Sequence, residues 1–214
     1  MEAAARSDAV RRTRIKFCGL TRAEDVRLAV DLGVDAIGFV LTRRSRRFVE
    51  PAAARLLRDL LPPFVAAVAL LMDDEPAWIE DAIRTVRPDF LQFHGEEEAA
   101  FCTRFGRRYL KAVPMASTGD LAAFAARHPR ACGFLLDSHA AGQPGGTGQA
   151  FDWSRVPVGF GRPLILAGGL HAGNVAEAVR TLQPWAVDVS SGIESAPGVK
   201  DAGRMRSFVA AIRA

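Results

Sequence analysis

Several features are scarce in this chain of 214 residues. It has three cysteines, Cys18, Cys102 and Cys132, and this odd number without paired spacing argues against a disulfide framework or a structural zinc site. The longest apolar run, residues 64–72, is too short for a transmembrane helix, which needs about 20 residues. Residues 1–14 contain four arginines but no apolar stretch of the kind found in a secretory signal. These absences predict a cytoplasmic protein that does not span a membrane.

Charge is also limited, with a formal net charge of +4. The densest basic cluster is Arg43, Arg44, Arg46 and Arg47, which surround Ser45. Such a cluster suits an anionic small molecule at least as well as a nucleic-acid surface. Nucleic-acid binding rests on this cluster alone, so we rank it last and expect a small-molecule partner.

Apolar runs alternate regularly with amphipathic segments along the chain, whose hydrophobic content is 49%. Candidate strands occupy residues 14–18, 36–41, 64–72, 90–93, 109–113, 133–136, 163–167 and 186–189. Candidate helices occupy residues 23–32, 52–61, 76–86, 97–105, 119–127, 173–182 and 201–212. Pro51 and Pro76 suit first helical turns, Gly33 suits a helix C-terminus, and Thr21 with Glu24 fits a capping box.

This alternation predicts a parallel sheet covered by helices. Eight units in about 200 residues specify a single-domain (β/α)8 TIM barrel over residues 14–214, preceded by a disordered tail at residues 1–13. The Gly-rich stretch after the sixth strand leaves room for one helical turn near residues 152–155, so that helix is shortened. A doubly wound open sheet is the alternative fold, but the glycine fingerprint usual after its first strand is absent.

Active sites of barrels lie at the carboxyl ends of the strands, and two reactive groups are expected there. Cys18 ends the first strand, where a neighbouring lysine and a helix N-terminus lower the pKa of a thiol. Asp137 ends the sixth strand, where partial burial raises a carboxyl pKa and suits a general acid. A buried inert thiol, and an N-cap or salt-bridge role for the carboxylate, are the structural alternatives.

A phosphate site is predicted in the loops after the last two strands. Gly168, Gly169, Ser191 and Gly192 lie there, and backbone N–H groups freed by glycine can surround phosphoryl oxygens. The alternative is two tight turns that need glycine for their backbone conformation. A thiolate base, a carboxylic acid and a phosphate site together indicate an isomerase that moves a proton at carbon.

The chain resembles the phosphoribosylanthranilate isomerases of tryptophan biosynthesis. The matching motifs run along nearly the whole chain after the first dozen residues: KFCGLT (16–21), DAIGFV (35–40), SRRFV (45–49), QFHGE (92–96), LLDS (135–138), GGTG (145–148) with FDW (151–153), LAGGL (166–170) with NV (174–175), and VDVSSGIE (187–194). Phe17 and Arg46 are small departures from the family pattern and remove no catalytic group.

The resemblance implies the substrate N-(5′-phosphoribosyl)anthranilate and its Amadori rearrangement to 1-(2-carboxyphenylamino)-1-deoxyribulose 5-phosphate. It implies Cys18 as general base, Asp137 as general acid and Arg47 as the partner of the anthranilate carboxylate. It also implies phosphate binding by the two Gly-containing loops and a lid at residues 145–148.

Three further polar residues are expected to line the site: Gln92, His94 and Asp188. His94 has either a proton-transfer role or a packing and hydrogen-bonding role, whereas Asp188 either orients the site or caps a turn. Asn174 is expected to cap the helix that follows it. No metal or organic cofactor is implied, and the protein is expected to be a monomer or a homodimer.

Two rival functions give different expectations. A related sugar-phosphate isomerase of histidine biosynthesis resembles a two-carboxylate catalyst with duplicated halves, but this chain has Cys18 in place of one carboxylate and shows no internal repeat. A non-catalytic phosphate-binding barrel would keep the glycines of the phosphate site. In that case the protein would have no turnover, and Cys18→Ala and Asp137→Asn would leave phosphate-ligand binding intact.

Overall fold

The computed structural model describes residues 12–138, 152–157 and 159–214. Of the expected tail at residues 1–13, only Arg12 and Thr13 are therefore described, and Arg12 forms an ion pair with Asp35. The expected lid at residues 145–148 lies outside the described residues.

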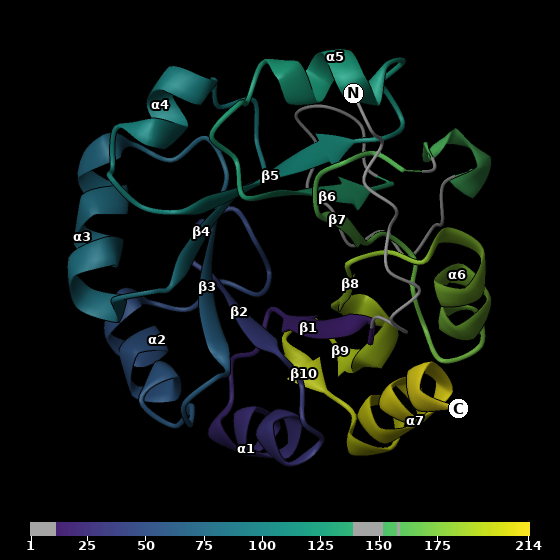
Figure 1. Cartoon of the computed structure of the whole chain (residues 1–214). Helices are drawn as coiled ribbons and strands as arrows, with labels where there is room; N and C mark the ends of the chain where they lie inside the picture. Colours follow the sequence, from purple (N-terminus) through teal and green to yellow (C-terminus); the bar gives the residue numbers. More distant parts are fainter. Residues whose placement is uncertain (1–11, 139–151, 158) are drawn as a thin grey trace.

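Eight parallel strands form a closed barrel in sequence order, which confirms the predicted fold (Figure 1). The strands are β1 (Arg14–Cys18), β2 (Ala36–Val40), β3 (Ala66–Leu71), β4 (Phe90–Phe93), β5 (Tyr109–Pro114), β6 (Gly133–Asp137), β7 (Leu164–Leu166) and β8 (Ala186–Val189). All of them run in the same direction, so their carboxyl ends meet at one rim of the barrel.

The α-helices lie around the outside of this barrel (Figure 1). They are α1 (Ala23–Asp31), α2 (Pro51–Arg58), α3 (Pro76–Val86), α4 (Ala99–Thr103), α5 (Leu121–Ala126), α6 (Val175–Leu182) and α7 (Ala202–Arg213). Pro51 and Pro76 lie in first turns as predicted. After β6 the described residues contain only the 3₁₀ turn η1 (Trp153–Arg155), which matches the single turn expected there.

Several predicted boundaries were wrong. β3 begins at Ala66 rather than at residue 64, because Phe64 lies in a turn with a φ of 72° and its side chain is fully exposed. α4 begins at Ala99 rather than at residue 97, because the Glu97 carboxylate accepts hydrogen bonds from the backbone N–H groups of Asp73 and Gly95. Glu97 therefore belongs to the loop before the helix.

Two predicted helix caps were also wrong. Thr21 donates its hydroxyl hydrogen bond to the Gly198 carbonyl at 2.6 Å, and the N-cap of α1 is Arg22, which makes no side-chain capping bond. Asn174 is the N-cap residue of α6 but makes no side-chain capping bond. Its amide instead joins the His171 N–H and the Gly169 carbonyl, at 2.9 and 3.0 Å. It therefore fixes the loop after β7.

Alternation along β1 separates two environments. Ile15 and Phe17 belong to the main hydrophobic cluster between strands and helices, and Phe17 contacts Phe208 of α7 with ring centroids 6.0 Å apart. Because successive strand residues point to opposite faces, Lys16 and Cys18 point into the barrel. A smaller apolar cluster inside the barrel consists of Leu110, Ala112, Leu135, Ile165, Ala167 and Ala186. The barrel interior is thus partly apolar and partly charged.

The sequence analysis missed one element, a short antiparallel hairpin after β8. It consists of β9 (Glu194–Ala196) and β10 (Val199–Lys200), and it follows the 3₁₀ turn η2 (Ser191–Ile193). Gly198, with a φ of 80°, provides the left-handed conformation at its turn.

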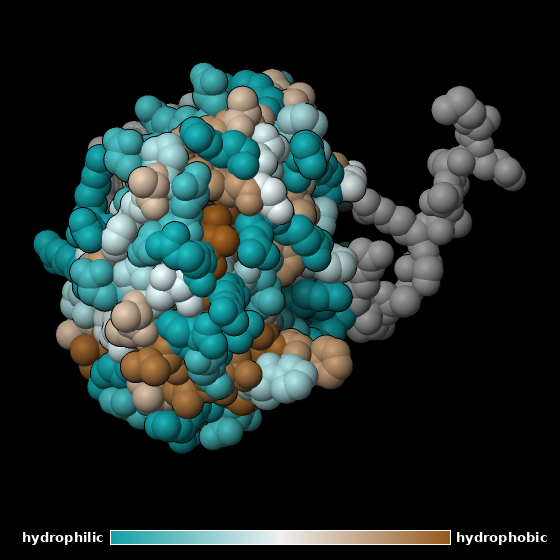
Figure 2. Space-filling model, turned by 90° about the vertical axis from the view of Figure 1, so that its left-hand side faces the viewer, coloured by the Kyte–Doolittle hydropathy of each residue, from teal (hydrophilic) through white to brown (hydrophobic). Residues whose placement is uncertain are grey.

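The outer surface is mostly hydrophilic on the side of the barrel drawn in Figure 2, with hydrophobic residues gathered toward its lower edge. Leu56 of α2 and Phe64 are among the exposed large hydrophobic residues. Within the described ranges, no helix is long and apolar enough to cross a membrane.

Candidate active site

Cys18 is buried at the carboxyl end of β1, where the prediction placed it. Burial raises the pKa of its thiol above the ordinary value, and the positive charges of Lys16 and Lys200 oppose that rise. The sequence-based expectation of a lowered pKa is therefore wrong for the free protein. α1 begins at Ala23, five positions along the chain, and the thiol lies in the desolvated barrel mouth.

Asp137 is buried at the carboxyl end of β6, beside a second titratable group. Its Oδ2 atom lies 3.4 Å from Nε2 of His94, which follows β4. The Gln92 amide lies 3.2 Å from Nδ1 of the same imidazole. If the Gln92 NH₂ donates to Nδ1, the Nε2 atom carries the hydrogen and faces the Asp137 carboxylate. The structure thus brings together three of the residues that the sequence predicted for the site.

The predicted phosphate loops lie close to one another and to Asp137. Gly168 and Gly169 both have positive φ values, 77° and 64°. A Cβ atom on Gly168 would lie 2.6 Å from the Ser138 backbone nitrogen, and one on Gly192 would lie 1.9 Å from the Leu170 carbonyl oxygen. The loops after β6, β7 and β8 therefore pack backbone against backbone at places where only glycine fits.

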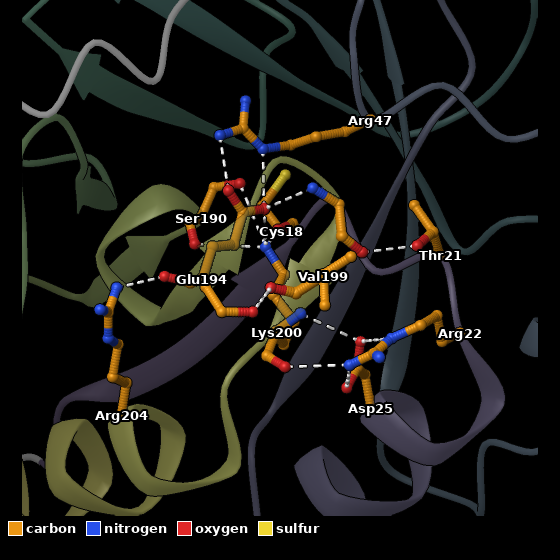
Figure 3. A network of polar contacts seen from close by, with 12 residues as sticks. Cys18, Thr21, Arg22, Asp25, Arg47, Ser190, Glu194, Val199, Lys200 and Arg204 are labelled. Atoms are coloured by element: carbon orange, nitrogen blue, oxygen red, sulfur yellow. Dashed lines mark hydrogen bonds and ion pairs between the residues drawn. The ribbon is translucent and has the colours of Figure 1, made fainter.

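Arg47 lies over the residue that follows Cys18. A Cβ atom on Gly19 would lie 2.6 Å from Cδ of Arg47. The guanidinium makes a bidentate pair with Glu194, with Nε–Oε1 and Nη2–Oε2 distances of 2.8 and 2.7 Å, and this bonding raises the pKa of Arg47. Figure 3 shows its third nitrogen directed away from Glu194. By contrast, Arg44 and Arg46 are exposed, as solvated charges would be, whereas the exposed Arg43 stacks on the Trp78 ring with its Cζ atom 4.1 Å from the ring centroid.

Lys200 and Glu194 are two buried residues to which the sequence analysis gave no role. The Lys200 ammonium lies 2.7 Å from Oε1 of Glu194 and donates to the carbonyl oxygens of Cys18 and Ser190, at 2.7 and 3.2 Å (Figure 3). Burial alone would raise the pKa of Glu194, but Arg47 and Lys200 outweigh it and lower that pKa. The hairpin thereby joins the ends of β1 and β8 and holds Arg47 in place.

Lys16 and Asp188 form another buried pair that the prediction recognised only in part. Asp188 was expected to line the site, and it accepts a hydrogen bond from the Lys16 ammonium at 2.8 Å. One signal was available, since Lys16 is a charged residue between the apolar residues Ile15 and Phe17.

A third buried pair fixes the loop that carries His94. The Lys111 ammonium lies 2.8 Å from a Glu97 carboxylate oxygen and 2.6 Å from the Gly95 carbonyl oxygen. The Glu96 N–H donates to Asp73 at 2.8 Å. The His94 backbone is therefore held from β3, β4 and β5.

No group of three His, Cys, Asp or Glu side chains suited to a metal ion occurs in the part of the chain that the structure describes. The closed eight-stranded barrel and the buried thiol, carboxyl and imidazole groups at its carboxyl rim define the class of this protein, a (β/α)8-barrel enzyme.

Comparison with known proteins gives the family. Residues 15–211 match the family described as N-(5′-phosphoribosyl)anthranilate (PRA) isomerase, and the chain belongs to it. The N-(5′-phosphoribosyl)anthranilate isomerase of Xanthomonas oryzae pv. oryzae strain PXO99A is 54% identical over 208 residues, which cover 94% of each chain.

Solved structures of family members share the fold. The phosphoribosyl anthranilate isomerase of Thermus thermophilus is 37% identical with a TM-score of 0.84, over 94% of this chain and 98% of that one. A phosphoribosyl anthranilate isomerase in complex with reduced 1-(o-carboxyphenylamino)-1-deoxyribulose 5-phosphate is 32% identical with a TM-score of 0.77, over the same shares of the two chains.

Proposed function

We propose that this chain converts N-(5′-phosphoribosyl)anthranilate into 1-(2-carboxyphenylamino)-1-deoxyribulose 5-phosphate, an Amadori rearrangement in tryptophan biosynthesis. Membership of the PRA isomerase family supports the substrate. The observation that carries the chemistry is the placement of Cys18 and Asp137, both buried at the carboxyl rim on strands separated by β7 and β8.

In this reaction Asp137 is the general acid and Cys18 the general base. Asp137 protonates the furanose ring oxygen, and the ring opens to a protonated Schiff base. This iminium acidifies the proton on ribose carbon 2, which the Cys18 thiolate removes. The resulting enolamine tautomerises to the ketone, so no redox partner or cofactor is required. His94 donates to the Asp137 carboxylate left after the first proton transfer, which stabilises that intermediate charge.

Two parts of the rim bind the substrate. Arg47 binds the anthranilate carboxylate through its guanidinium, which Glu194 and Gly19 hold in one orientation. Phosphate is bound by the backbone of Gly168, Gly169, Ser191 and Gly192. Gln92 and Asp188 line the pocket. Gln92 orients the His94 imidazole, and Asp188 orients the Lys16 ammonium.

The proposal extends to the organisation of the molecule. Residues 14–214 belong to one catalytic domain. The enzyme works in the cytoplasm, where the three cysteines of the described chain stay as free thiols. The active unit is a monomer or a homodimer, which sedimentation equilibrium distinguishes.

The test is the loss of anthranilate-type fluorescence when freshly made substrate is mixed with wild type, Cys18→Ala or Asp137→Asn at equal folded concentration. We expect turnover by the wild type and a loss of about 10²-fold or more in kcat for each variant, because each removes one positioned proton-transfer group. Cys132→Ala is the matched control, since this half-buried thiol precedes β6 at the end away from the rim and only packs against the inner apolar cluster, and its kcat should equal that of the wild type.

Either of two results would count against the proposal. If Asp137→Asn retained more than about a tenth of the activity, Asp137 would not be the general acid. Absence of wild-type turnover, with phosphate ligands still bound, would favour a non-catalytic phosphate-binding barrel.

A further inference from the structure

The inward face of β1 carries a lysine next to the reactive thiol. Lys16 and Cys18 are two positions apart on one strand, so both side chains point into the barrel. A Cβ atom on Gly38 of β2 would lie 2.8 Å from Sγ of Cys18 and 3.2 Å from Nζ of Lys16. The two side chains thus converge on one point of the neighbouring strand, and the positive charge of Lys16 acts to lower the pKa of the Cys18 thiol.

Asp188 holds this lysine from the other side. Lys16 and Asp188 are direct register partners in the β1–β8 pair, and their Nζ–Oδ1 distance is 2.8 Å. Their side chains are only 5% and 9% exposed. Burial would lower the pKa of Lys16, but Asp188 and Cys18 outweigh it and raise that pKa. Lys16 is therefore charged at neutral pH, although it is surrounded by protein.

The other charges that face Cys18 are engaged elsewhere. Lys200 of β10 and Arg47 of the loop after β2 both make ion pairs with Glu194, at 2.7 Å each. Lys200 reaches the backbone carbonyl of Cys18 rather than its sulfur. Lys16 is thus the cation whose side chain converges with the sulfur at Gly38, and Asp188 is the anion paired with it.

We infer that Lys16 is a positioning residue that holds the catalytic thiolate of Cys18 by an ammonium–sulfur hydrogen bond, and that Asp188 sets the strength of this hold. Without the ammonium the thiolate would be a desolvated anion in the barrel mouth, and the pKa of the thiol would rise further above its ordinary value. Asp188 competes with the sulfur for the same ammonium, so the two partners of Lys16 oppose each other. The inference rests on the proposed function only for the role of Cys18 as base.

The experiment measures the pH dependence of alkylation of Cys18 by iodoacetamide, because the thiolate is the form that reacts. Cys132→Ala is the background, and Cys102 adds little because burial raises its pKa to about 12. In this background we compare Lys16→Met, Asp188→Asn and the double variant Lys16→Met/Asp188→Asn. The double variant removes both charges, so it leaves no unpaired buried ion and preserves folding if the single variants do not.

We expect opposite shifts from the two single substitutions. Lys16→Met should raise the pKa of Cys18 by about one unit or more, which lowers the alkylation rate at pH 7 about tenfold or more. Asp188→Asn should lower the pKa, because Lys16 then interacts with the sulfur alone. In the double variant the pKa of Cys18 should still be higher than in the wild type, since Lys16 and Cys18 project from one strand and converge at Gly38, whereas Asp188 belongs to β8. The acidic limb of the kcat/KM profile should move in the same directions.

A matched control is Lys111→Met/Glu97→Gln, which neutralises another buried lysine–carboxylate pair, and it should leave alkylation of Cys18 unchanged. The inference would be overturned if the pKa of Cys18 shifted in the same direction in both single variants, or if it did not shift in the double variant. The Lys16–Asp188 pair would then be purely structural. Alkylation needs no substrate, so this outcome is separate from failure of the proposed reaction. If the variants show the expected pKa shifts but the wild type has no turnover, the proposed reaction is wrong and the inferred contact between Lys16 and the thiolate is still supported.

Discussion

At the scale of single residues, the site depends on glycines as much as on charged groups. Gly19 has a φ of 72° and lies directly under Arg47, while Gly168 and Gly192 allow three loops to touch through their backbones. A side chain at Gly19 would displace Arg47, and a side chain at Gly168 or Gly192 would push the neighbouring loops apart.

Gly19→Ala tests this dependence. The added methyl would lie 2.6 Å from Cδ of Arg47, so the arginine must move away from its position over Gly19. We expect KM to rise about tenfold, since the carboxylate of the substrate loses a preformed partner.

Gly106→Ala is the control for this change. Gly106 has a similar φ of 62°, but a methyl group there meets no atom within 4 Å. It should cost about 1 kcal/mol of stability from backbone strain and leave KM unchanged. An equal KM for the two variants would show that Arg47 does not depend on Gly19.

At the scale of elements, the hairpin of β9 and β10 ties the end of β1 to the end of β8. Lys200 has a fully buried side chain that reaches both strand ends and Glu194, and the Arg22 guanidinium donates to its carbonyl oxygen at 2.9 Å. Asp25 accepts a hydrogen bond from the Lys200 N–H at 3.2 Å. The hairpin is therefore a structural part of the rim and not a surface appendage.

Lys200→Met should reduce the free energy of unfolding by about 3–5 kcal/mol, because it leaves buried carbonyl and carboxylate oxygens without their cation. Urea unfolding followed by circular dichroism measures the change. Arg206→Met, on the exposed face of α7, should stay within about 0.5 kcal/mol of the wild type. A loss below about 1 kcal/mol in Lys200→Met would show that the hairpin does not stabilise the rim.

At the scale of the whole molecule, stability should depend on pH through a buried histidine far from the proposed chemistry. His128 is packed against Phe124 and Tyr109, and burial lowers its pKa to about 4. The unfolded chain, with an ordinary histidine pKa of about 6.5, binds this proton more readily than the folded chain. The stability from neutral His128 is therefore present above about pH 6.5 and is lost as the pH falls toward 4.

His128→Phe keeps an aromatic ring in the same packing and removes the proton. Its urea midpoint should fall less than that of the wild type between pH 7 and pH 5. His171→Gln replaces an exposed histidine and should keep the wild-type pH response. Identical pH responses of wild type and His128→Phe would contradict the assignment.

The sequence by itself determined the fold and most of the rim. Strand and helix periods, with Pro51 and Pro76 at helix starts, were sufficient for a barrel because these are local properties of neighbouring residues. The barrel then fixed which residues lie at the rim, because every parallel strand ends there. Cys18 and Asp137 could therefore be predicted as rim residues from their position in the chain alone.

Only the tertiary structure decided how these residues are paired. Lys16 meets Asp188 and Lys200 meets Cys18 across more than 170 positions of the chain, and no local pattern records such contacts. The pKa of Cys18 also depended on tertiary structure, because burial by distant strands outweighs the neighbouring lysine. Sequence sets the period and the chemistry of each position, whereas desolvation and ion pairing depend on which distant groups the closed barrel brings within a few ångströms.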